Sequence, residues 1–560
     1  MTEQTTLELE RLESIRGRSF FGRFAGYAGM TGPGWLQAAV TLGGGSLAGA
    51  LYLGVVAGYS LMWLQPLAML CGVVMLMALS HVTLSSKGTP FDSVKRTISP
   101  VLAWGWLGAT VLADVVFCAA QASLGVATVQ QNLGMGGVNA YVITGVLAAV
   151  GFAAAVLYAK GSRSVNRLEL ILKVMVALVM VSFAIAAGVL LVNGQVDVGA
   201  LLRGFVPDPR ALVEPAESIE PMIAATGEGA GYWAAYVEDQ QRSRIIAAFG
   251  TAVGINMTFL LPYTLINRGW GRKHRELSRF DLVLALLLPF SVATALLVVC
   301  SASAFHAQDG DVLDEAGRPL PALESGYYKV LNQRLAELGE VPTDADAAKA
   351  AADALPEAER RLAATLTNRD AKQLADTLAP VMGERPADVV FGLGVLAMAL
   401  STMIVHMMMN GFAVSQAVGR PGAFGPFVVG AAMPAGLAVF APLAWTGDAK
   451  TALLIPAAVI ATVFLPIAYL AILLLMNSRA VLAKEDRASP VANGFMVVAA
   501  GVATAASVWM LANTKRELLG WDKWGFVGIG GLVLIAVIGV VGFLRGQRKA
   551  GVSGDGVGSA

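Results

Sequence analysis

Small polar residues interrupt a long apolar segment near the start of the chain, and they offer the chemistry of neutral oxygen ligands. Gly32-Pro33-Gly34 opens this segment, and Gly43-Gly44-Gly45-Ser46 divides it into two apolar halves. Glycine costs about 1 kcal/mol relative to alanine inside a helix, so three in succession predict an unwound turn with free carbonyls and amides. Close packing between helices is the alternative use of such glycines.

A second interruption stands in the apolar run near residues 243–267, where Pro262 lies within Leu260-Leu261-Pro262-Tyr263-Thr264. Proline removes an amide donor and clashes with the preceding turn, so it kinks or breaks a helix. Paired breaks in two repeated halves mark the binding site of many transporters. We therefore expect breaks at 43–46 and 261–264 that face each other. The candidate substrate-binding residues are Thr41, Gly43, Gly44, Gly45, Ser46, Asn256, Thr258, Leu261, Tyr263 and Thr264.

Both predicted breaks lack an acidic residue, and this limits the substrates that they suit. A dehydrated divalent cation needs anionic ligands or many neutral oxygens. Iron and manganese are selected partly by sulfur and imidazole. Two alternatives stay open: a hard ion such as magnesium that keeps much of its water, or an uncharged or zwitterionic solute. A solute carboxylate would suit free amides at half-helix N-termini.

A few other chemically distinctive side chains lie within or beside the apolar runs. Asp114 is a candidate for proton or ion coupling because acids inside a membrane are costly; a structural hydrogen bond is the alternative. His406, among Met407, Met408 and Met409, is interpreted as a packing residue with no carboxylate nearby. Asp281 is expected to cap the seventh span. Glu228 fits an outer mouth or a loop equally well.

The composition excludes several classes of protein. Of 560 residues 56% are hydrophobic and only 14% charged, with a net charge of +1. Ordinary soluble chains carry about 25% charged residues, and the balanced charge excludes a nucleic-acid partner. Three scattered cysteines predict no disulfide framework. The chain lacks a nucleotide-binding loop, a zinc-protease motif and a nucleophile elbow, so we expect neither an enzyme nor a cofactor.

Apolar stretches of about 20 residues predict transmembrane helices. Twelve such stretches lie at 30–54, 57–84, 102–130, 140–159, 168–192, 243–267, 281–304, 387–412, 424–445, 451–476, 491–512 and 524–544. Basic residues concentrate after the even-numbered spans, most densely at 268–279, whereas the loop 131–139 has none and the loop 446–450 has only one. The loop 513–523 is the exception, because it follows an odd-numbered span and still has three basic residues. By the positive-inside rule both termini are cytoplasmic, in the inner (plasma) membrane, with the lipid bilayer as a partner.

This pattern divides the chain into six parts. They are a cytoplasmic amphipathic arm (1–29), a first five-helix repeat (30–192), an outer loop (193–242), a second five-helix repeat (243–476) with an outer insertion (305–385), two additional spans (477–548) and a disordered tail (549–560). Within the insertion, residues 345–375 are interpreted as amphipathic helix. The insertion is acidic, which suits either a solvated cap or a vestibule that attracts cations.

The order of several motifs resembles the Nramp metal-ion transporters. Residues 32–63 are similar to the first span of that family, including Gly58-Tyr59 and Trp63. Further similarities are Arg167-Leu168-Glu169, Leu202–Pro207, Arg279-Phe280-Asp281, Ala304-Phe305-His306, Leu378-Ala379-Pro380, Gly394–Ala397 and Leu465-Pro466. The resemblance implies an all-α, LeuT-like fold of five-plus-five inverted repeats, and transport of a divalent cation as secondary carrier or facilitator.

The departures from that family bear on its metal site. Its Asp-Pro-Gly-Asn metal-binding turn is matched by Gly43–Ser46, its Met-Pro-His by Leu261-Pro262-Tyr263, and its tenth-span glutamine by Phe464. Asp114 matches one acid of its proton-relaying pair, whereas Phe117 replaces the other. The resemblance thus implies weak binding of manganese and iron, with magnesium favoured and the metal ligands unknown. A solute carrier and a non-transporting, receptor-like protein remain alternatives.

Overall fold

The computed structural model describes residues 3–554 except for 87, 161, 341–343, 377–378, 380–382, 445–453 and 514–523. Over this part of the chain the secondary structure is helical, apart from one isolated bridge between Leu313 and Pro319. Eleven helical segments are long and apolar enough to cross a membrane, and a bent pair near the N-terminus makes a twelfth. The predicted all-α polytopic class, with about twelve spans, is therefore confirmed.

The first half of the molecule contains a broken span followed by four continuous ones. Its helices are α1 (Glu3–Arg16), α2 (Phe20–Ala28), α3 (Pro33–Thr41), α4 (Gly44–Ala57), α5 (Leu64–Ser85), α6 (Pro90–Thr97), α7 (Pro100–Ala127), α8 (Ala140–Ala159) and α9 (Ser162–Val192). The bent pair is α3 and α4, which meet at 52°. A π-helical turn, Thr128–Asn132, extends α7.

The second half follows α9, and its first long helix, α12, starts at Ala230, inside the expected outer loop 193–242. Its helices are α10 (Val198–Arg203), α11 (Glu220–Ala225), α12 (Ala230–Ala252), α13 (Met257–Asn267), α14 (Arg275–Leu282), α15 (Leu288–Phe305), α21 (Glu384–Ala417), α22 (Phe424–Val439), α23 (Ala441–Ala444), α24 (Leu454–Met476), α25 (Pro490–Ala512) and α26 (Trp524–Gly554). The helix α26 thus continues into the expected tail, of which 555–560 lie outside the described residues. The loop 446–450 also lies outside the described residues, and so does the loop 513–523 except for Asn513.

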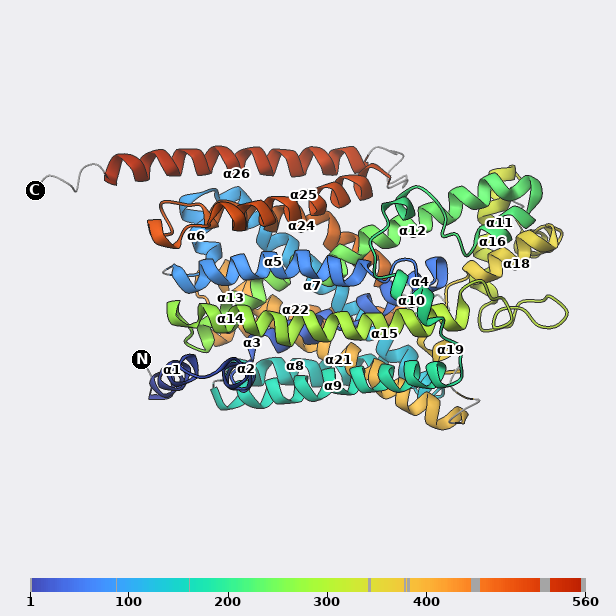
Figure 1. The fold of residues 1–560 in the computed structure, drawn as a ribbon, viewed down its shortest axis with the longest axis horizontal. Coiled ribbons are helices and arrows are strands. Elements are labelled where there is room, and N and C mark those ends of the chain that lie inside the picture. The colour runs from blue at the N-terminus through green and yellow to red at the C-terminus, as the bar shows by residue number, and fades with distance from the viewer. Residues whose placement is uncertain are drawn as a thin grey trace, which may run out of the picture.

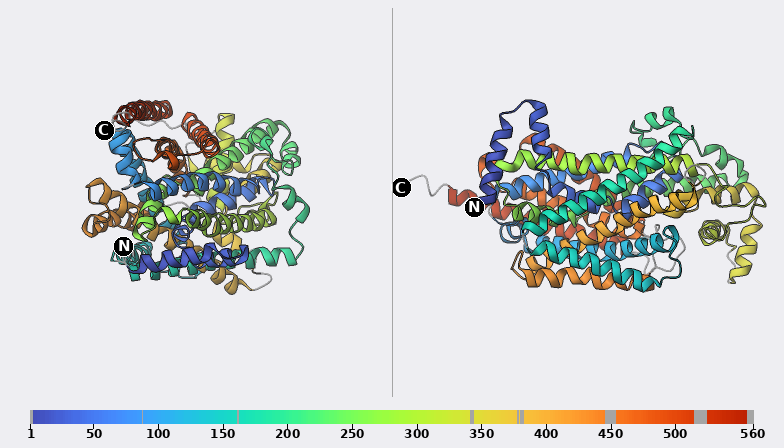
Figure 2. Two further views of the ribbon diagram at one scale, coloured as in Figure 1. Left: turned by 60° about the vertical axis from the view of Figure 1, so that its left-hand side comes forward. Right: turned by 90° about the horizontal axis from the view of Figure 1, so that it is seen from below.

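The insertion 305–385 forms a cap at the end of the bundle opposite α1 and α2 (Figures 1 and 2). Its helices are α16 (Glu324–Leu338), α17 (Ala345–Asp353), α18 (Glu357–Leu366) and α19 (Ala371–Asp376). The expected single amphipathic stretch 345–375 is therefore three helices, because Pro356 starts a new one at α18.

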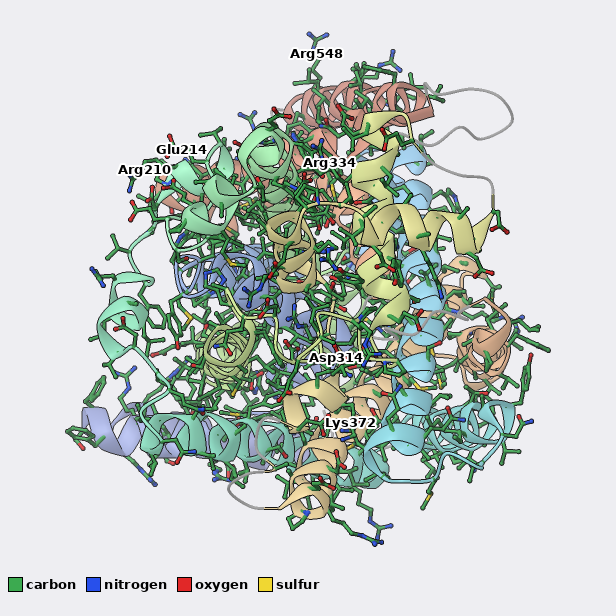
Figure 3. All side chains as sticks on the ribbon, turned by 90° about the vertical axis from the view of Figure 1, so that its right-hand side faces the viewer. Arg210, Glu214, Asp314, Arg334, Lys372 and Arg548 are labelled. Carbon is green, nitrogen blue, oxygen red and sulfur yellow. The ribbon has the colours of Figure 1, made fainter. Side chains whose placement is uncertain are left out.

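Buried charges hold the cap together, and one of them also contacts α12. Arg334 of α16 donates to Glu359 of α18 over 2.8 Å, and Glu359 also accepts from the Trp233 indole of α12 over 2.8 Å. Figure 3 looks onto this end and shows Arg334 among the cap helices. Arg369, which is fully buried, forms a bidentate pair with Asp311, also of the insertion. A buried pair is costly to break, since the remaining charge is left without a partner, so these pairs stabilise the cap itself.

Two long helices, α7 and α21, pack against each other through the centre of the bundle and enclose the broken span. The helix α21 also contacts α3, α9 and α22, and α7 also contacts α24. By contrast, α26 lies at the edge of the bundle (Figure 1). The side chains that α7 and α21 direct inward are therefore the ones that meet the interrupted helices.

Candidate functional site

The first interruption lies at Leu42 and Gly43, between α3 and α4. A break in this span is therefore confirmed, although it comes slightly earlier than 43–46, and Gly44 already begins the second half-helix. Gly43 needs no unusual backbone angles (φ −110°). A Cβ atom there would lie 2.4 Å from Thr402 Oγ1 on α21, so the close approach of α21 requires glycine.

Neutral side chains occupy the backbone groups that this break exposes. Gly44 N–H donates to Gln121 Oε1 of α7 over 3.1 Å. The Ser46 hydroxyl donates to the carbonyl of Thr41. Ser401 and Thr402 of α21 both donate to the Ala39 carbonyl. Buried backbone groups must be paired, and here the partners are amides and hydroxyls without charge.

The second interruption comprises residues 253–256, between α12 and α13, and not 261–264. The backbone of Val253 is extended (φ −140°, ψ 101°), and Asn256 caps α13 by accepting from Met257 N over 3.1 Å. Pro262 stands inside α13. The prediction of a break at Pro262 is thus wrong, because a proline removes one amide and the rest of this well-packed helix persists around it.

A buried carboxylate and an imidazole hold the second interruption. Asp114 Oδ1 of α7 lies 3.0 Å from Asn256 Nδ2 and 3.0 Å from His406 Nδ1 of α21. Asn256 Nδ2 also lies 3.1 Å from His406 Nδ1, so the three side chains form one hydrogen-bonded cluster. The Phe117 ring stacks on His406 with centroids 5.4 Å apart. All three polar side chains are almost fully buried.

The interpretation of His406 as a packing residue without a carboxylate nearby is therefore wrong. Asp114 and His406 are separated by 292 residues in the sequence, and only the packing of α7 against α21 unites them. The expectation that Asp281 caps the seventh span is also wrong. Its carboxylate accepts from Gly32 N over 3.0 Å and from Gly34 N over 2.6 Å, and so caps α3 of the first span.

A cavity of about 20 Å³ lies between the two breaks. Its lining includes four of the predicted site residues, namely Thr41, Gly45, Ser46 and Asn256. It also includes residues that were not predicted: Val40, Phe117, Gln121, Gly250, Thr251, Gly254, Met257, Thr402 and His406. Gly254 followed by Asn256, a residue that favours helix caps, was the one local signal that could have found the second break.

The other six predicted site residues do not line this cavity. Gly43 lies in the first break, and Gly44 is the first residue of α4. Thr258 accepts from the Trp106 indole over 2.7 Å. Leu261, Tyr263 and Thr264 belong to the body of α13 and do not line the cavity: Tyr263 donates to Gln416, and Thr264 to the Leu261 carbonyl. Their assignment followed from the misplaced break.

Further polar groups lie near the cavity between α4, α5 and α12. Gln65 of α5 is buried, and neither atom of its amide has a partner; a Cβ on Gly49 would lie 3.4 Å from this amide and 3.9 Å from the Thr251 hydroxyl. Further along α4 and α12, the Arg244 guanidinium lies 5.1 Å from the centre of the Tyr52 ring. Buried polar atoms are normally paired, and the Gln65 amide departs from that rule.

Charged side chains fix the start of α3, on the side of the site that faces α1 and α2. Arg268 donates to Glu169 over 2.6 Å, and Lys173 donates to the Thr31 carbonyl over 3.2 Å. Together with the contact between Asp281 and Gly34, these bonds join the start of α3 to α9 and to the segment that follows α13. One ion pair and several hydrogen bonds thus fix the start of α3 at this end of the bundle.

No cluster of three or more His, Cys, Asp or Glu side chains that could hold a metal occurs among the described residues. The donors around the cavity are instead amide and hydroxyl oxygens, one imidazole and the Met257 thioether, whose sulfur lies 3.4 Å from the Thr41 hydroxyl. Such a set offers mainly neutral oxygen ligands with a single carboxylate behind them.

Comparison with known proteins places these features in context. A family model described as natural resistance-associated macrophage protein-like (Nramp) matches residues 34–330 and 350–513. A structure of the Eremococcus coleocola manganese transporter with an aromatic bis-isothiourea substituted compound is 14% identical and has a TM-score of 0.66, covering 95% of this chain and 97% of that one. A structure of a histidine-to-alanine mutant of that transporter is 13% identical in sequence to this chain and has a TM-score of 0.63, with the same coverage of both chains. No curated protein sequence matches.

Proposed function

The chain belongs to the Nramp family, and from this premise we propose that it carries a divalent cation through the cavity between its two broken helices. The family comprises secondary transporters and not enzymes. The chain is accordingly an integral membrane protein with the LeuT-like arrangement of five-plus-five inverted repeats and two further spans.

The observation that carries this proposal is the size of the cavity. A volume of about 20 Å³ accommodates a single water or ion, whereas pockets for organic ligands measure about 300–1,000 Å³. This difference favours an ion over the zwitterionic or uncharged solute that the sequence left open.

We assign cation binding to the oxygen atoms of Thr41, Ser46, Gln121 and Asn256. Hard ions such as magnesium prefer oxygen ligands, whereas sulfur and imidazole favour softer metals. The Nδ1 atom of His406 is already engaged by Asp114. Magnesium is therefore the favoured substrate over manganese or iron, and the retained waters of the ion would complete its shell in a more open state.

Asp114 supplies the negative charge for this site. Its Oδ1 atom accepts from two side chains that line the cavity, Asn256 and His406. Its Oδ2 atom is buried without a partner, and an unpaired buried carboxylate oxygen is costly. A cation in the cavity would offset this cost through Asn256. A proton on the Asp114–His406 pair would do so as well, and the pair therefore suits ion or proton coupling.

Uptake into liposomes tests the proposal. We expect saturable magnesium uptake by the wild type and manganese uptake at least tenfold slower at the same concentration. Thr41→Val should weaken magnesium uptake several-fold, whereas Thr264→Val, the same change away from the cavity, should not. Preference for manganese would refute the ion assignment, and absence of flux for both ions would indicate a non-transporting protein.

The orientation in the membrane is part of the same proposal, with both termini in the cytoplasm and the cap outside. The exposed Ala347 of α17 gives a place to test it. In a Cys71→Ser background, Ala347→Cys should react with an impermeant maleimide on intact cells. Reaction only after permeabilisation would reverse the topology.

A further inference from the structure

A second, larger cavity lies at the edge of the bundle, where α26 passes the junction of α6 and α7 (Figure 1). Its volume is about 960 Å³, and it shares no lining residue with the central cavity. Its walls come from the chain around Ile98, from the loop at Arg479, and from the face of α26 between Val537 and Lys549.

Close backbone contacts hold α26 at one side of this cavity and leave the rest open. A Cβ on Gly542 would lie 2.0 Å from the Ile98 carbonyl oxygen, and one on Gly546 would lie 2.5 Å from that of Thr97. The Gln547 side chain accepts from Arg479 N over 3.2 Å and donates to the Asn477 carbonyl over 2.8 Å. The walls are thus fixed by contacts that need glycine, and the cavity is a built feature of the fold.

The charge of the cavity is strongly positive. Five basic residues line it, with no acidic residue among the lining: Lys95, Arg96, Arg479, Arg545 and Lys549. Within the described part of the chain, the first four of these form no ion pair with a carboxylate. Lys95 instead lies 4.9 Å from the ring of Trp104. A concentration of cations of this kind attracts an anion.

The cavity also has an apolar half, supplied by Ile98, Val537, Ile538 and Val541. Along α26 the lining changes from Val537 to Arg545 and Lys549 within twelve residues, which a helix spans in about 18 Å. An apolar part next to a part lined by basic side chains matches the boundary between the acyl chains and the headgroups of a bilayer. A small soluble anion would use only the basic half.

We propose that this cavity binds an anionic phospholipid. Its phosphate lies among Arg96, Arg479 and Arg545, and its acyl chains run along Val537 and Val541. The bound lipid fills the gap that the glycine contacts leave between α26 and the α6–α7 junction. It thereby joins the last span, which is otherwise weakly packed, to the rest of the bundle.

Retention of lipid by the purified full-length protein in detergent tests the proposal. The probes are phosphatidylglycerol and phosphatidylcholine with identical acyl chains, measured by native mass spectrometry. We expect phosphatidylglycerol to bind at least tenfold more tightly. Equal binding of the two lipids would overturn the proposal, as would displacement of phosphatidylglycerol by inorganic phosphate at equal concentration, because that result would indicate a soluble-anion site.

Matched variants localise the binding. The triple variant Arg96→Gln, Arg479→Gln, Arg545→Gln should lose at least tenfold in affinity for phosphatidylglycerol. The control Lys160→Gln, Arg420→Gln, Arg548→Gln removes as many exposed charges outside the cavity, and should change affinity less than twofold (Arg548 is labelled in Figure 3). Equal losses would place the lipid elsewhere. If the triple variant does not fold, Arg479→Gln alone should still reduce binding about threefold, and an unchanged affinity would refute the site.

Discussion

The two helix breaks differ in how their turns and exposed backbone groups are stabilised. At the first, Gly43 gives α21 room to approach the turn, and neutral groups of Gln121, Ser46 and Thr402 take up the exposed amides and carbonyls. At the second, Asn256 forms the turn, and the Asp114 carboxylate with the His406 imidazole holds it from outside the broken helix. The site therefore has a neutral wall and a charged wall.

Under the proposed function, this difference separates the two tasks of a cation site. The neutral wall supplies oxygen ligands without repelling or trapping the ion, because uncharged dipoles bind a divalent cation only moderately. The charged wall supplies the negative potential that brings the cation into a low-dielectric interior. A site divided in this way should lose more function when its charge is removed than when any one neutral ligand is removed.

Removal of the charge should have the largest effect. Asp114→Asn keeps the volume of the side chain and an oxygen that can accept from His406, but it removes the negative charge. The attraction between a carboxylate and a divalent cation is then lost, and a loss of about 3 kcal/mol corresponds to more than a hundredfold in affinity. We expect magnesium uptake at low concentration to fall by that order, as measured by initial rates in liposomes.

A double-mutant cycle shows whether Asp114 and His406 act as one unit. We expect Asp114→Asn combined with His406→Gln to lose little more than Asp114→Asn alone, because residues in one network are not additive. Additive losses would mean that the two side chains contribute separately and that the charged wall is not a pair.

Steric contact at the neutral wall should have the next largest effect. Gly43→Ala places a methyl group against Thr402, and overpacking of this kind costs about 1–3 kcal/mol. We expect a lower melting temperature, and its recovery in the double variant with Thr402→Ala. Gly49→Ala, on the same span with its nearest contact at 3.4 Å, is the control and should be neutral. Failure of Thr402→Ala to rescue would contradict the role of close packing.

The sequence was sufficient for the fold and for the first break, but not for Gln121 and Thr402, which pair with that break from α7 and α21. Apolar length identified the spans, and glycine is costly enough in a helix to mark the first break within one or two residues. The second break was misplaced because Pro262 is the stronger local signal, although α13 continues through it. The free energy lost with one missing hydrogen bond is small compared with the free energy gained by burying a whole helix.

The charged wall could not be read from the sequence for a different reason. Asp114, Asn256 and His406 lie on three helices far apart in the chain, and only tertiary packing brings them together. His406 in particular stands among methionines, so its neighbours in the sequence give no sign of its carboxylate partner. Asp281 shows the same effect, because the helix it caps belongs to the other half of the molecule.

The position of the second break at 253–256 can be tested with two substitutions, whose expected effects on affinity are smaller. A Cβ on Gly254 would lie 2.5 Å from Asn256 Oδ1, so Gly254→Ala should displace the cap and weaken magnesium affinity several-fold. Pro262→Ala, inside α13, should leave affinity unchanged within about twofold. Isothermal titration of the purified variants measures both. The reverse order of effects would restore the break to Pro262.

The smallest expected effect concerns how the outer end of the first broken span is fixed. His306, just beyond α15, contacts the Val55 carbonyl through Nδ1 over 2.9 Å and the Ser218 hydroxyl through Nε2 over 2.6 Å. It packs where Gly58, with φ +56°, ends α4. Burial lowers the pKa of His306 below its ordinary value of 6.5, and the bond to Val55 only partly opposes this.

The unfolded chain therefore takes up this proton first as the pH falls. The stability that neutral His306 contributes is complete above about pH 6.5 and is lost as the pH falls through the lower pKa of the folded protein. We expect the melting temperature to be lower at pH 5.5 than at pH 7.5. This difference should shrink in His306→Gln, which keeps a donor for Val55 but does not titrate. An undiminished difference in that variant would show that another group, and not the attachment of α4, sets the pH dependence.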